Sequence, residues 1–170
     1  MRRVRYHVAM SLDGFIAGPQ GEYDWLIADP EIDIANLFSQ FDTFLIGRKT
    51  FEVMVKAGRG TIPGVKTFVF SRTLRPSDYP DVTIVADHIA ETVAGLKAEP
   101  GKDIWLFGGG ELFRSLLNAG LVDTVEVMVE PVLLGGGISL LPAPAQRTNL
   151  KLREHKIYKT GIVSLSYAVE

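Results

Sequence analysis

Cysteine is absent from this chain of 170 residues, and histidine occurs only three times. Without cysteine the protein has no disulfide, no thiolate nucleophile and no cysteine-ligated zinc or iron–sulfur site. His7, His88 and His155 do not stand at the spacing of paired metal ligands. We therefore expect no bound metal.

An excess of charge of either sign is also absent, because 18 Lys and Arg oppose 20 Asp and Glu. A nucleic-acid-binding surface requires a clustered basic excess. The opening Arg2, Arg3 and Arg5 are followed at once by an apolar strand, and we interpret them as a solvated strand edge. No apolar run approaches the ~20 residues of a membrane span, and no stretch of signal-peptide length opens the sequence. The expected location is cytoplasmic, with no nucleic-acid or membrane partner.

The composition is that of an ordinary globular protein, with 46% hydrophobic and 22% charged residues. A chain of this size buries roughly 70% of its unfolded surface, which is enough for a substantial core. The sequence shows no internal repeat, low-complexity segment or linker. We expect residues 1–170 to form a single domain.

Apolar periodicity predicts an alternation of strands and helices. The expected strands are 3–10, 43–46, 66–70, 82–85, 103–107 and 124–129. Helices are expected after the Asp29-Pro30 start signal, from Thr50 to about Lys56, from an Asp87 cap to about Ala98, and over 111–119. The first helix would place Ile34, Leu37, Phe38 and Phe41 on one face. Strands 150–157 and 162–169 would form a hairpin around Lys159-Thr160-Gly161. This order predicts an α/β fold with a mainly parallel central sheet, helices on both faces and a C-terminal antiparallel hairpin.

Three glycine-rich or cationic turns follow strands of the predicted sheet. They are Gly47-Arg48-Lys49-Thr50, Ser71-Arg72 and Gly108-Gly109-Gly110. Ligands in such sheets bind at the carboxyl ends of the strands. Glycines let a phosphate approach the backbone, and helix N-termini offer free N–H groups with partial positive charge. The three turns together predict an anion-binding edge that matches neither the G-x-G-x-x-G fingerprint nor the P-loop.

Several stretches of the chain are typical of a known family: VAMSLDGFIAG, FLIGRKTFE, FVFSR, IWLFGGGELFRSLLNAGLVD and VEPVLLGGG. They resemble the dihydrofolate-reductase-like fold, and specifically the reductase domain of the riboflavin-biosynthesis deaminase-reductase family, over about residues 3–169. The resemblance implies a three-layer fold, a homodimer, and NADPH-dependent hydride transfer to a small heterocyclic or ribityl-bearing substrate, as in 5-amino-6-(5-phosphoribosylamino)uracil reductase. The deaminase half of the riboflavin enzyme needs a His/Cys zinc site, which a cysteine-free chain lacks.

The same resemblance implies a role for each turn. Gly47, Arg48, Lys49 and Thr50 would bind the cofactor's phosphates, and Ser71 and Arg72 would hold the 2′-phosphate that distinguishes NADP from NAD. Gly108, Gly109, Gly110, Glu111 and Leu112 would surround the pyrophosphate, with a cis glycine–glycine peptide. Ala9, Ile16 and Ala17 would line the nicotinamide, and Asp13 of the SLDG motif would orient the substrate or supply a proton.

Other candidate substrate contacts have ordinary alternatives. Trp25 would stack on a substrate ring or pack over the first helix. Dihydrofolate reductases proper carry an acid on the first helix, and either Glu31 or Asp33 would take that place, with Asp33 alternatively a solvated helix residue. Glu130 approaches the LLGGG stretch and could face the substrate, whereas His7 is expected to face a sheet surface. Two other functions stay open, namely dihydrofolate reduction proper and a non-catalytic nucleotide-binding module.

Overall fold

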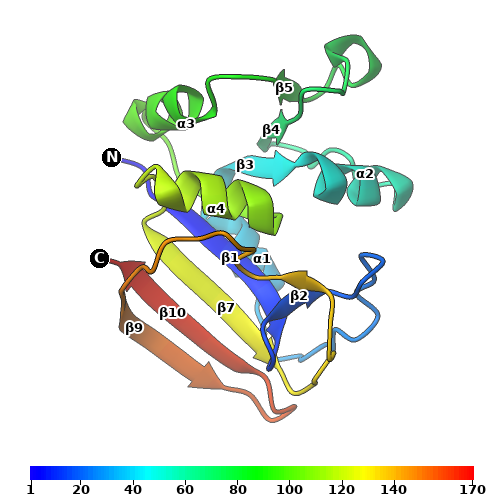
Figure 1. Ribbon diagram of the computed structural model, residues 1–170, viewed down its shortest axis with the longest axis vertical. Coiled ribbons are helices and arrows are strands. Elements are labelled where there is room, and N and C mark those ends of the chain that lie inside the picture. The colour runs from blue at the N-terminus through cyan, green and yellow to red at the C-terminus, as the bar shows by residue number, and fades with distance from the viewer.

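The computed structural model describes residues 1–170, and its main feature is one eight-stranded sheet (Figure 1). The strands lie in the order β5-β4-β3-β6-β1-β7-β10-β9. In chain order they are β1 (Val4–Ser11), β3 (Phe41–Gly47), β4 (Lys66–Phe70), β5 (Thr83–Val85), β6 (Asp103–Gly108), β7 (Thr124–Glu130), β9 (Leu150–Ile157) and β10 (Val163–Val169). The strands from β5 to β7 pair in parallel, and β10 runs antiparallel to both β7 and β9. The predicted α/β fold, with a mainly parallel sheet and a terminal antiparallel hairpin, is therefore confirmed.

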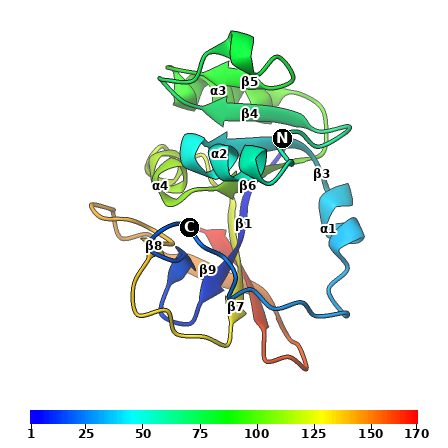
Figure 2. The same cartoon turned by 90° about the vertical axis from the view of Figure 1, so that its right-hand side faces the viewer.

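Four helices cover the two faces of this sheet. They are α1 (Ile34–Ser39), α2 (Arg48–Lys56), α3 (Ile89–Ala98) and α4 (Gly110–Asn118). Side chains of α1 and α2 join an apolar cluster on one face, and those of α3 and α4 join a second cluster on the other. Figure 2 shows α1 and α4 on opposite sides of β1. None of these helices is long and apolar enough to cross a membrane.

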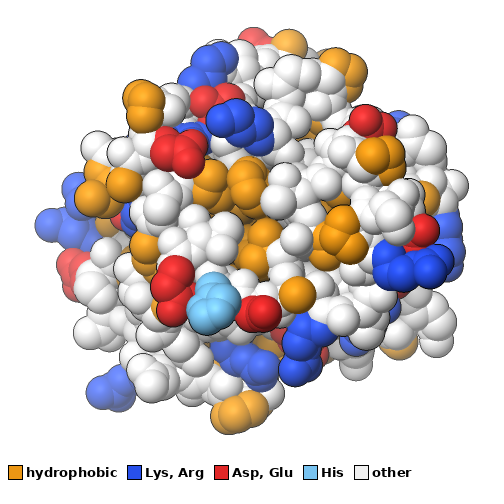
Figure 3. Space-filling view, turned by 90° about the horizontal axis from the view of Figure 1, so that it is seen from above, with side chains coloured by type: hydrophobic (Ala, Val, Ile, Leu, Met, Phe, Trp, Pro, Cys, Tyr) orange, Lys and Arg blue, Asp and Glu red, His pale blue; other side chains and the backbone are white.

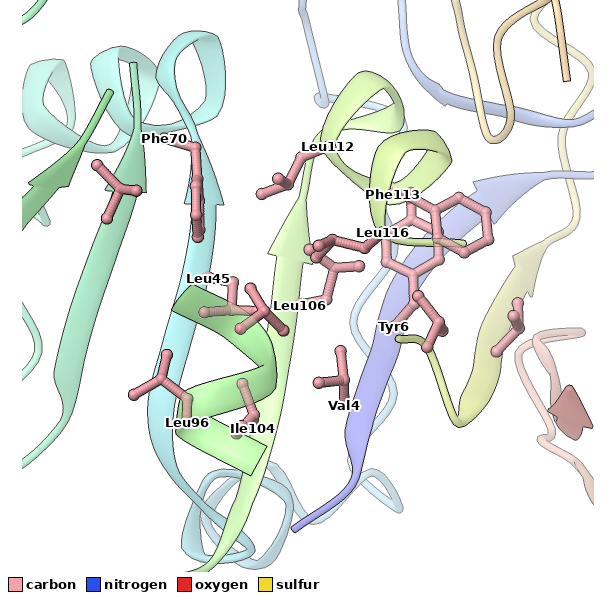
Figure 4. Close-up of a cluster of buried hydrophobic side chains, with 14 of the residues drawn as sticks. Val4, Tyr6, Leu45, Phe70, Leu96, Ile104, Leu106, Leu112, Phe113 and Leu116 are labelled. Atoms are coloured by element: carbon pink, nitrogen blue, oxygen red, sulfur yellow. The ribbon is translucent and has the colours of Figure 1, made fainter. Parts of the chain in front are cut away.

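The larger apolar cluster lies between the sheet and the helices α3 and α4 (Figure 4). Leu112, Phe113 and Leu116 are buried there, at a spacing that places them on one face of α4. Phe113 stacks on Tyr6 of β1 with the ring centroids 3.9 Å apart. This packing fixes the start of α4, and with it the glycine turn that precedes the helix.

The first helix begins later than the sequence predicts. α1 starts at Ile34 and is capped by Asp33, whose carboxylate accepts a backbone N–H of the first turn at 2.9 Å. Asp29, the predicted cap, accepts the Glu31 N–H at 2.8 Å in a turn that does not continue into the helix, and its other carboxylate oxygen accepts a hydrogen bond from the Thr160 hydroxyl at 2.6 Å. That bond holds the segment before α1 against the turn of the C-terminal hairpin. Phe41 was predicted on the helix face and is instead the first residue of β3.

Two further features differ from the prediction. The N-cap of α3 is His88 rather than Asp87, because His88 takes a left-handed conformation with φ 52° directly before the helix. A small antiparallel pair, β2 (Phe15–Ala17) with β8 (Ile138–Ser139), was not predicted at all. Strands this short carry little periodicity, and these two pair across more than half the chain.

The first arginines are mostly buried, and the prediction of a solvated strand edge is wrong for two of them. Arg2 is 5% exposed and pairs with Asp42 of β3, while Arg5 is 9% exposed and pairs with Glu126 of β7. The acids that neutralise them come from strands distant in sequence. Acidic and basic side chains are also interspersed over the face seen in Figure 3.

Candidate functional site

Two of the predicted cofactor turns lie against each other at the carboxyl edge of the parallel strands. Ile46 of β3 pairs with Gly108 of β6, so the residues that follow run side by side. A Cβ atom at Gly47 would lie 3.3 Å from the Gly109 nitrogen, and one at Gly109 would lie 3.3 Å from the Thr50 hydroxyl oxygen. The Gly108–Gly109 peptide is cis, as the resemblance implied. Glycine, having no Cβ, lets the two turns approach this closely.

Each of these turns leads directly into a helix. α2 begins at Arg48 and α4 at Gly110, and no side chain caps either helix start. The N–H groups of both first turns are free to bind an anion, and the helix dipoles favour negative charge there. A Cβ at Gly110 would lie 2.7 Å from the Ser139 carbonyl oxygen, so the chain at β8 packs against the start of α4. The arrangement is suited to a phosphate or pyrophosphate.

Glu111 and Leu112 occupy the first turn of α4 but have different surroundings. Glu111 is exposed, whereas Leu112 is 7% exposed and its side chain belongs to the core. Only the backbone of Leu112 is therefore placed to contact a ligand, if one binds at this turn.

The cationic side chains near this edge differ in their partners. Arg48 forms an ion pair with Glu52 one turn along α2, with Nη1 and Oε2 3.0 Å apart. Lys49 and Arg72 are exposed and have neither a hydrogen-bond partner nor an ion-pair partner in the protein. Of the three cations predicted to contact phosphate, two are therefore free to do so without breaking an existing pair.

Ser71 shapes the turn that carries Arg72. Its hydroxyl oxygen accepts hydrogen bonds from the N–H groups of the second and third following residues, at 3.1 and 3.0 Å. Ser71 is 8% exposed, so Arg72 is the member of the pair that faces solvent. Because Phe70 pairs with Gly47, this turn follows β4 beside the turn that follows β3.

Asp13 joins two loops. Its carboxylate accepts hydrogen bonds from the Ser11 hydroxyl at 2.7 Å and from the N–H groups of Leu134 and Gly135 at 3.0 and 2.7 Å. These bonds, the one from Ser11 foremost, hold the pKa of Asp13 below its ordinary value. A carboxyl group that stays ionised is a poor proton donor. The geometry therefore favours the orienting role predicted for Asp13 over the proton-supplying one.

The residues predicted to line the nicotinamide lie on β1 and β2, the two strands on either side of Asp13 in the sequence. Ala9 lies in β1 and pairs with Met128 of β7, while Ile16 and Ala17 lie in β2. A Cβ at Gly137 would lie 2.2 Å from the Ala17 carbonyl oxygen, so the glycines of the LLGGG stretch let the loop before β8 pass close to β2.

Glu130 is a buried carboxyl group at the carboxyl end of β7. It is 4% exposed, pairs in register with Ser11, and accepts a hydrogen bond from the Ile27 N–H at 3.4 Å. Burial raises the pKa of Glu130 above its ordinary value and outweighs the opposing effect of that bond. Trp25 lies in the same loop as Ile27, half-buried, and its indole N–H donates to the Glu22 carbonyl oxygen at 3.1 Å.

A cavity of about 310 Å³ lies between α1 and the sheet. Its lining residues are Glu31, Ile32, Asp33, Asn36, Leu37 and Gln40 on the helix side, and His7, Met128, Glu154, Lys156, Tyr158 and Ser164 on the sheet side. Ala9 pairs with Met128 and lies two residues from His7 on the same strand face, roughly 7 Å away. The cavity therefore adjoins the position predicted for the nicotinamide.

A charged network behind one wall of this cavity was missed by the sequence reasoning. The Glu126 carboxylate accepts two N–H groups of Arg5 at 2.7 and 2.8 Å and the Thr124 hydroxyl at 2.8 Å. Nδ1 of His7 lies 3.3 Å from the same carboxylate. Burial would raise the pKa of Glu126, but the bonds from His7 and Arg5 and the charge of Arg5 outweigh it and lower the pKa to about 2. The only local sign of this network is that Arg5 and His7 share one face of β1.

Comparison with known proteins assigns the chain to a family. The sequence-family model of the RibD C-terminal domain matches residues 2–164 of the chain. The chain belongs to the RibD C-terminal domain family. YyaP, an uncharacterized protein of Bacillus subtilis, is 38% identical over 178 aligned positions that cover 98% of this chain and 94% of YyaP. YwjB of the same organism, also uncharacterized, is 32% identical and covers 95% of both chains.

Solved structures share the fold. A protein from Shewanella sp. PV-4 named for riboflavin biosynthesis superposes with a TM-score of 0.85 at 24% identity, over 100% of this chain and 99% of that one. The Thermotoga maritima deaminase/5-amino-6-(5-phosphoribosylamino)uracil reductase superposes with a TM-score of 0.75 at 15% identity, over 99% of this chain and 57% of that one. Dihydrofolate reductase from Enterococcus faecalis, complexed with NADP(H), superposes with a TM-score of 0.68 at 20% identity. The match covers 99% of this chain and 96% of that one. The dihydrofolate-reductase-like fold is thereby confirmed.

Within this fold the predicted site residues fall into two groups. The turns at Gly47–Thr50, Ser71–Arg72 and Gly108–Gly110 lie at the ends of the neighbouring strands β3, β4 and β6. The predicted substrate contacts are more dispersed. Asp33 lines the cavity under α1, whereas Asp13 and Glu130 lie at the carboxyl ends of β1 and β7.

Proposed function

We propose that the chain is an NADPH-dependent reductase of a small heterocyclic or ribityl-bearing substrate, acting in the cytoplasm. The observation that carries this proposal is the contact between the Gly47–Thr50 turn and the Gly108–Gly110 turn, which brings two uncapped helix starts together. Its family is that of a reductase domain, and the T. maritima protein of the same fold is a uracil-derivative reductase, which supports the assignment.

The residues at this edge fit a dinucleotide phosphate. The pyrophosphate would accept N–H groups at the starts of α2 and α4, and the unpaired cations Lys49 and Arg72 would contact the remaining phosphates. Ala9, Ile16 and Ala17 would line the nicotinamide. Bound NADPH would supply the hydride, so the protein's own task is to position the two reactants and exclude competing reactions.

The substrate would occupy the cavity under α1, next to Ala9. Charged and amide side chains make up much of the lining, which suits a heterocycle rich in hydrogen-bonding atoms. Asp33 would contact it from the helix side. Asp13 and Glu130 would hold the loops around its reactive end, with Trp25 in the same loop region.

The cofactor assignment is tested by measuring the Kd of NADPH and of NADH for three proteins. In Arg72→Ala we expect NADPH binding to weaken by about 10- to 100-fold, the equivalent of one charge-assisted hydrogen bond, with little change for NADH. Arg75→Ala is the matched control, because Arg75 is exposed nearby but pairs with Asp78 at 3.1 Å. Absence of NADPH binding to the wild type would contradict the proposal. An unchanged NADP/NAD preference in Arg72→Ala would remove the role of Arg72.

Turnover is tested separately with NADPH saturating. Initial rates with 7,8-dihydropterin, 5-amino-6-ribosylaminouracil and simple carbonyl compounds would show whether the chain reduces a substrate of the proposed class. Tight NADPH binding with no reduction of any of them would instead indicate a non-catalytic nucleotide-binding module.

Dihydrofolate reduction is the second candidate, and one observation favours it. Glu31 and Asp33, the two acids at the start of the first helix, both line the cavity. A pteridine-pairing acid of dihydrofolate reductases proper lies on the corresponding helix. An activity assay with dihydrofolate and a binding titration with methotrexate test this candidate. If the protein neither reduces dihydrofolate nor binds methotrexate, dihydrofolate reduction is excluded.

We also propose that the protein forms a homodimer through the C-terminal hairpin. Every residue of β9 is exposed, including Leu150, Leu152 and Ile157, and β9 is an edge strand. Exposed apolar edge strands are otherwise protected in native proteins. Light scattering on the wild type and on Leu152→Asp tests this, and a monomeric wild type would contradict it.

A further inference from the structure

His7 stands between the cavity and the Glu126 network. Its ring lines the cavity, and its Nδ1 lies 3.3 Å from the Glu126 carboxylate. The ring is set edge-on to Trp105 with centroids 5.4 Å apart, and the Trp105 indole N–H donates to the His7 carbonyl oxygen at 2.9 Å. Both the backbone and the ring of His7 are therefore held in place, and Nε2 has no hydrogen-bond partner in the protein.

Glu126 determines which nitrogen of the neutral ring carries the hydrogen. Arg5 and Thr124 direct donors at its oxygens, so Glu126 is held as a carboxylate. A carboxylate only accepts hydrogen bonds, and the nitrogen that faces it must donate. Nδ1 of His7 therefore carries the hydrogen, which leaves Nε2 as the basic nitrogen.

We infer that His7 is a catalytic residue that delivers a proton from Nε2 to the substrate bound in the cavity. This inference rests on the proposed function. Reduction of a C=N or C=O group requires a hydride on carbon, which NADPH supplies as it becomes NADP⁺, and one proton on nitrogen or oxygen. The Nε2–H bond of the imidazolium breaks as the new N–H or O–H bond forms, and the neutral ring then regains a proton from solvent.

The position of His7 suits this role better than those of the other candidates. It shares a strand face with Ala9, roughly 7 Å away, so a planar heterocycle in the cavity could reach both Nε2 and the nicotinamide position. Asp13 stays ionised because three donors contact its carboxylate. Glu130 is not among the residues that line the cavity.

Other ionisable groups face His7 from every element around it. They are Arg5 on β1, Glu126 on β7, Glu154 and Lys156 on β9, Tyr158 after β9, and Glu31 and Asp33 before α1. A pH–rate profile therefore reports on several groups at once. Variants of His7 itself are needed to identify its own contribution.

Two substitutions each keep a hydrogen-bonding group near one ring nitrogen of His7 and remove the ability to transfer a proton. His7→Asn keeps an N–H group near the place of Nδ1 and has nothing at Nε2, whereas His7→Gln places near Nε2 an amide that cannot exchange a proton. With 7,8-dihydropterin and 5-amino-6-ribosylaminouracil as probes, we expect both variants to lower kcat at least about 100-fold and to lose one limb of the pH profile. The Kd of NADPH should stay within about twofold. His88→Asn is the matched control, because His88 is exposed and its left-handed backbone suits asparagine.

A second readout needs neither cofactor nor substrate. Nitrogen-15 NMR of histidine-labelled protein should show the neutral His7 ring with its hydrogen on Nδ1, and Glu126→Gln should shift the hydrogen toward Nε2. A hydrogen on Nε2 in the wild type would overturn the inference, as would a kcat within threefold of wild type in both His7 variants. Failure of the wild type to bind NADPH or to reduce either probe would overturn the proposed function and the catalytic role with it. Intact turnover with the wrong tautomer would overturn the role of His7 alone.

Discussion

Replacing Glu126 with glutamine should lower the free energy of unfolding by more than breaking any exposed ion pair of the protein would. The Arg5 guanidinium and the Glu126 carboxylate both have 11% of their side-chain surface exposed, and two hydrogen bonds of 2.7 and 2.8 Å join them. Glutamine keeps the shape of the side chain but removes the charge. Arg5 would then face a neutral amide in place of the carboxylate, and its other partners would be Gln40 at 2.7 Å and Asp103 at 3.5 Å.

The magnitude follows from the lowered pKa of Glu126. A fall from the ordinary value of 4.5 to about 2 corresponds to ~3 kcal/mol of folding free energy at pH 7. Removing one partner of a buried pair typically costs a similar ~3–5 kcal/mol. We therefore expect Glu126→Gln to lower the free energy of unfolding by ~2–4 kcal/mol. In a chain of this length, that is a fall of roughly 5–15 °C in Tm.

Urea unfolding at pH 7.0, 5.0 and 3.5 is the assay. The folded-state pKa is depressed, so the contribution of Glu126 is complete above the unfolded-state pKa and is lost as pH falls through the folded-state value. The difference between wild type and Glu126→Gln should therefore shrink by on the order of 1 kcal/mol between pH 7.0 and 3.5. Asp78→Asn is the control, because the Arg75–Asp78 side chains are 77% and 47% exposed. A cost below ~1 kcal/mol for Glu126→Gln, or a difference that does not shrink in acid, would refute the reasoning.

Three further predictions concern stability. Gly110→Ala would bring a Cβ within 2.7 Å of the Ser139 carbonyl oxygen, so it should lower stability by ~1–3 kcal/mol and weaken NADPH binding. The Cβ of Gly95→Ala in α3 meets nothing within 4 Å, so this variant should raise stability by ~0.5–1 kcal/mol. Equal urea midpoints for the two variants would contradict this. Tyr6→Phe removes a buried hydroxyl that has no hydrogen-bond partner, so thermal unfolding should show a Tm at or above that of wild type, not below it. Glu130→Gln should stabilise the protein at pH 8, where the wild-type carboxyl must ionise while buried, and the gain should vanish below the unfolded-state pKa near 4.5. A gain that is the same at pH 8 and pH 4 would count against a raised pKa.

The sequence was most informative where structure follows from local pattern. Apolar alternation and short apolar runs located all eight strands of the main sheet, and the glycines of the Gly108–Gly110 turn marked the start of α4. Helix starts were less secure. Asp29-Pro30 has every local feature of a start signal, and Asp29 does accept the Glu31 N–H, yet only a turn forms there and the helix begins at Ile34. The Asp29 carboxylate also accepts the Thr160 hydroxyl, a contact with the C-terminal hairpin that no local pattern indicates.

What the sequence by itself determined is the α/β class, the glycine turns and the strand ends where an anion would bind, because these depend on periodicity and on residues that lack a Cβ. The tertiary structure decided the cavity under α1 and the partnership of His7, Arg5 and Glu126. That partnership joins β1 to β7 across 119 residues and depends on strand register, where a slip of one residue turns every side chain to the opposite face. Register is a property of the assembled sheet, so the proton-handling wall of the cavity became visible only once the strands were paired.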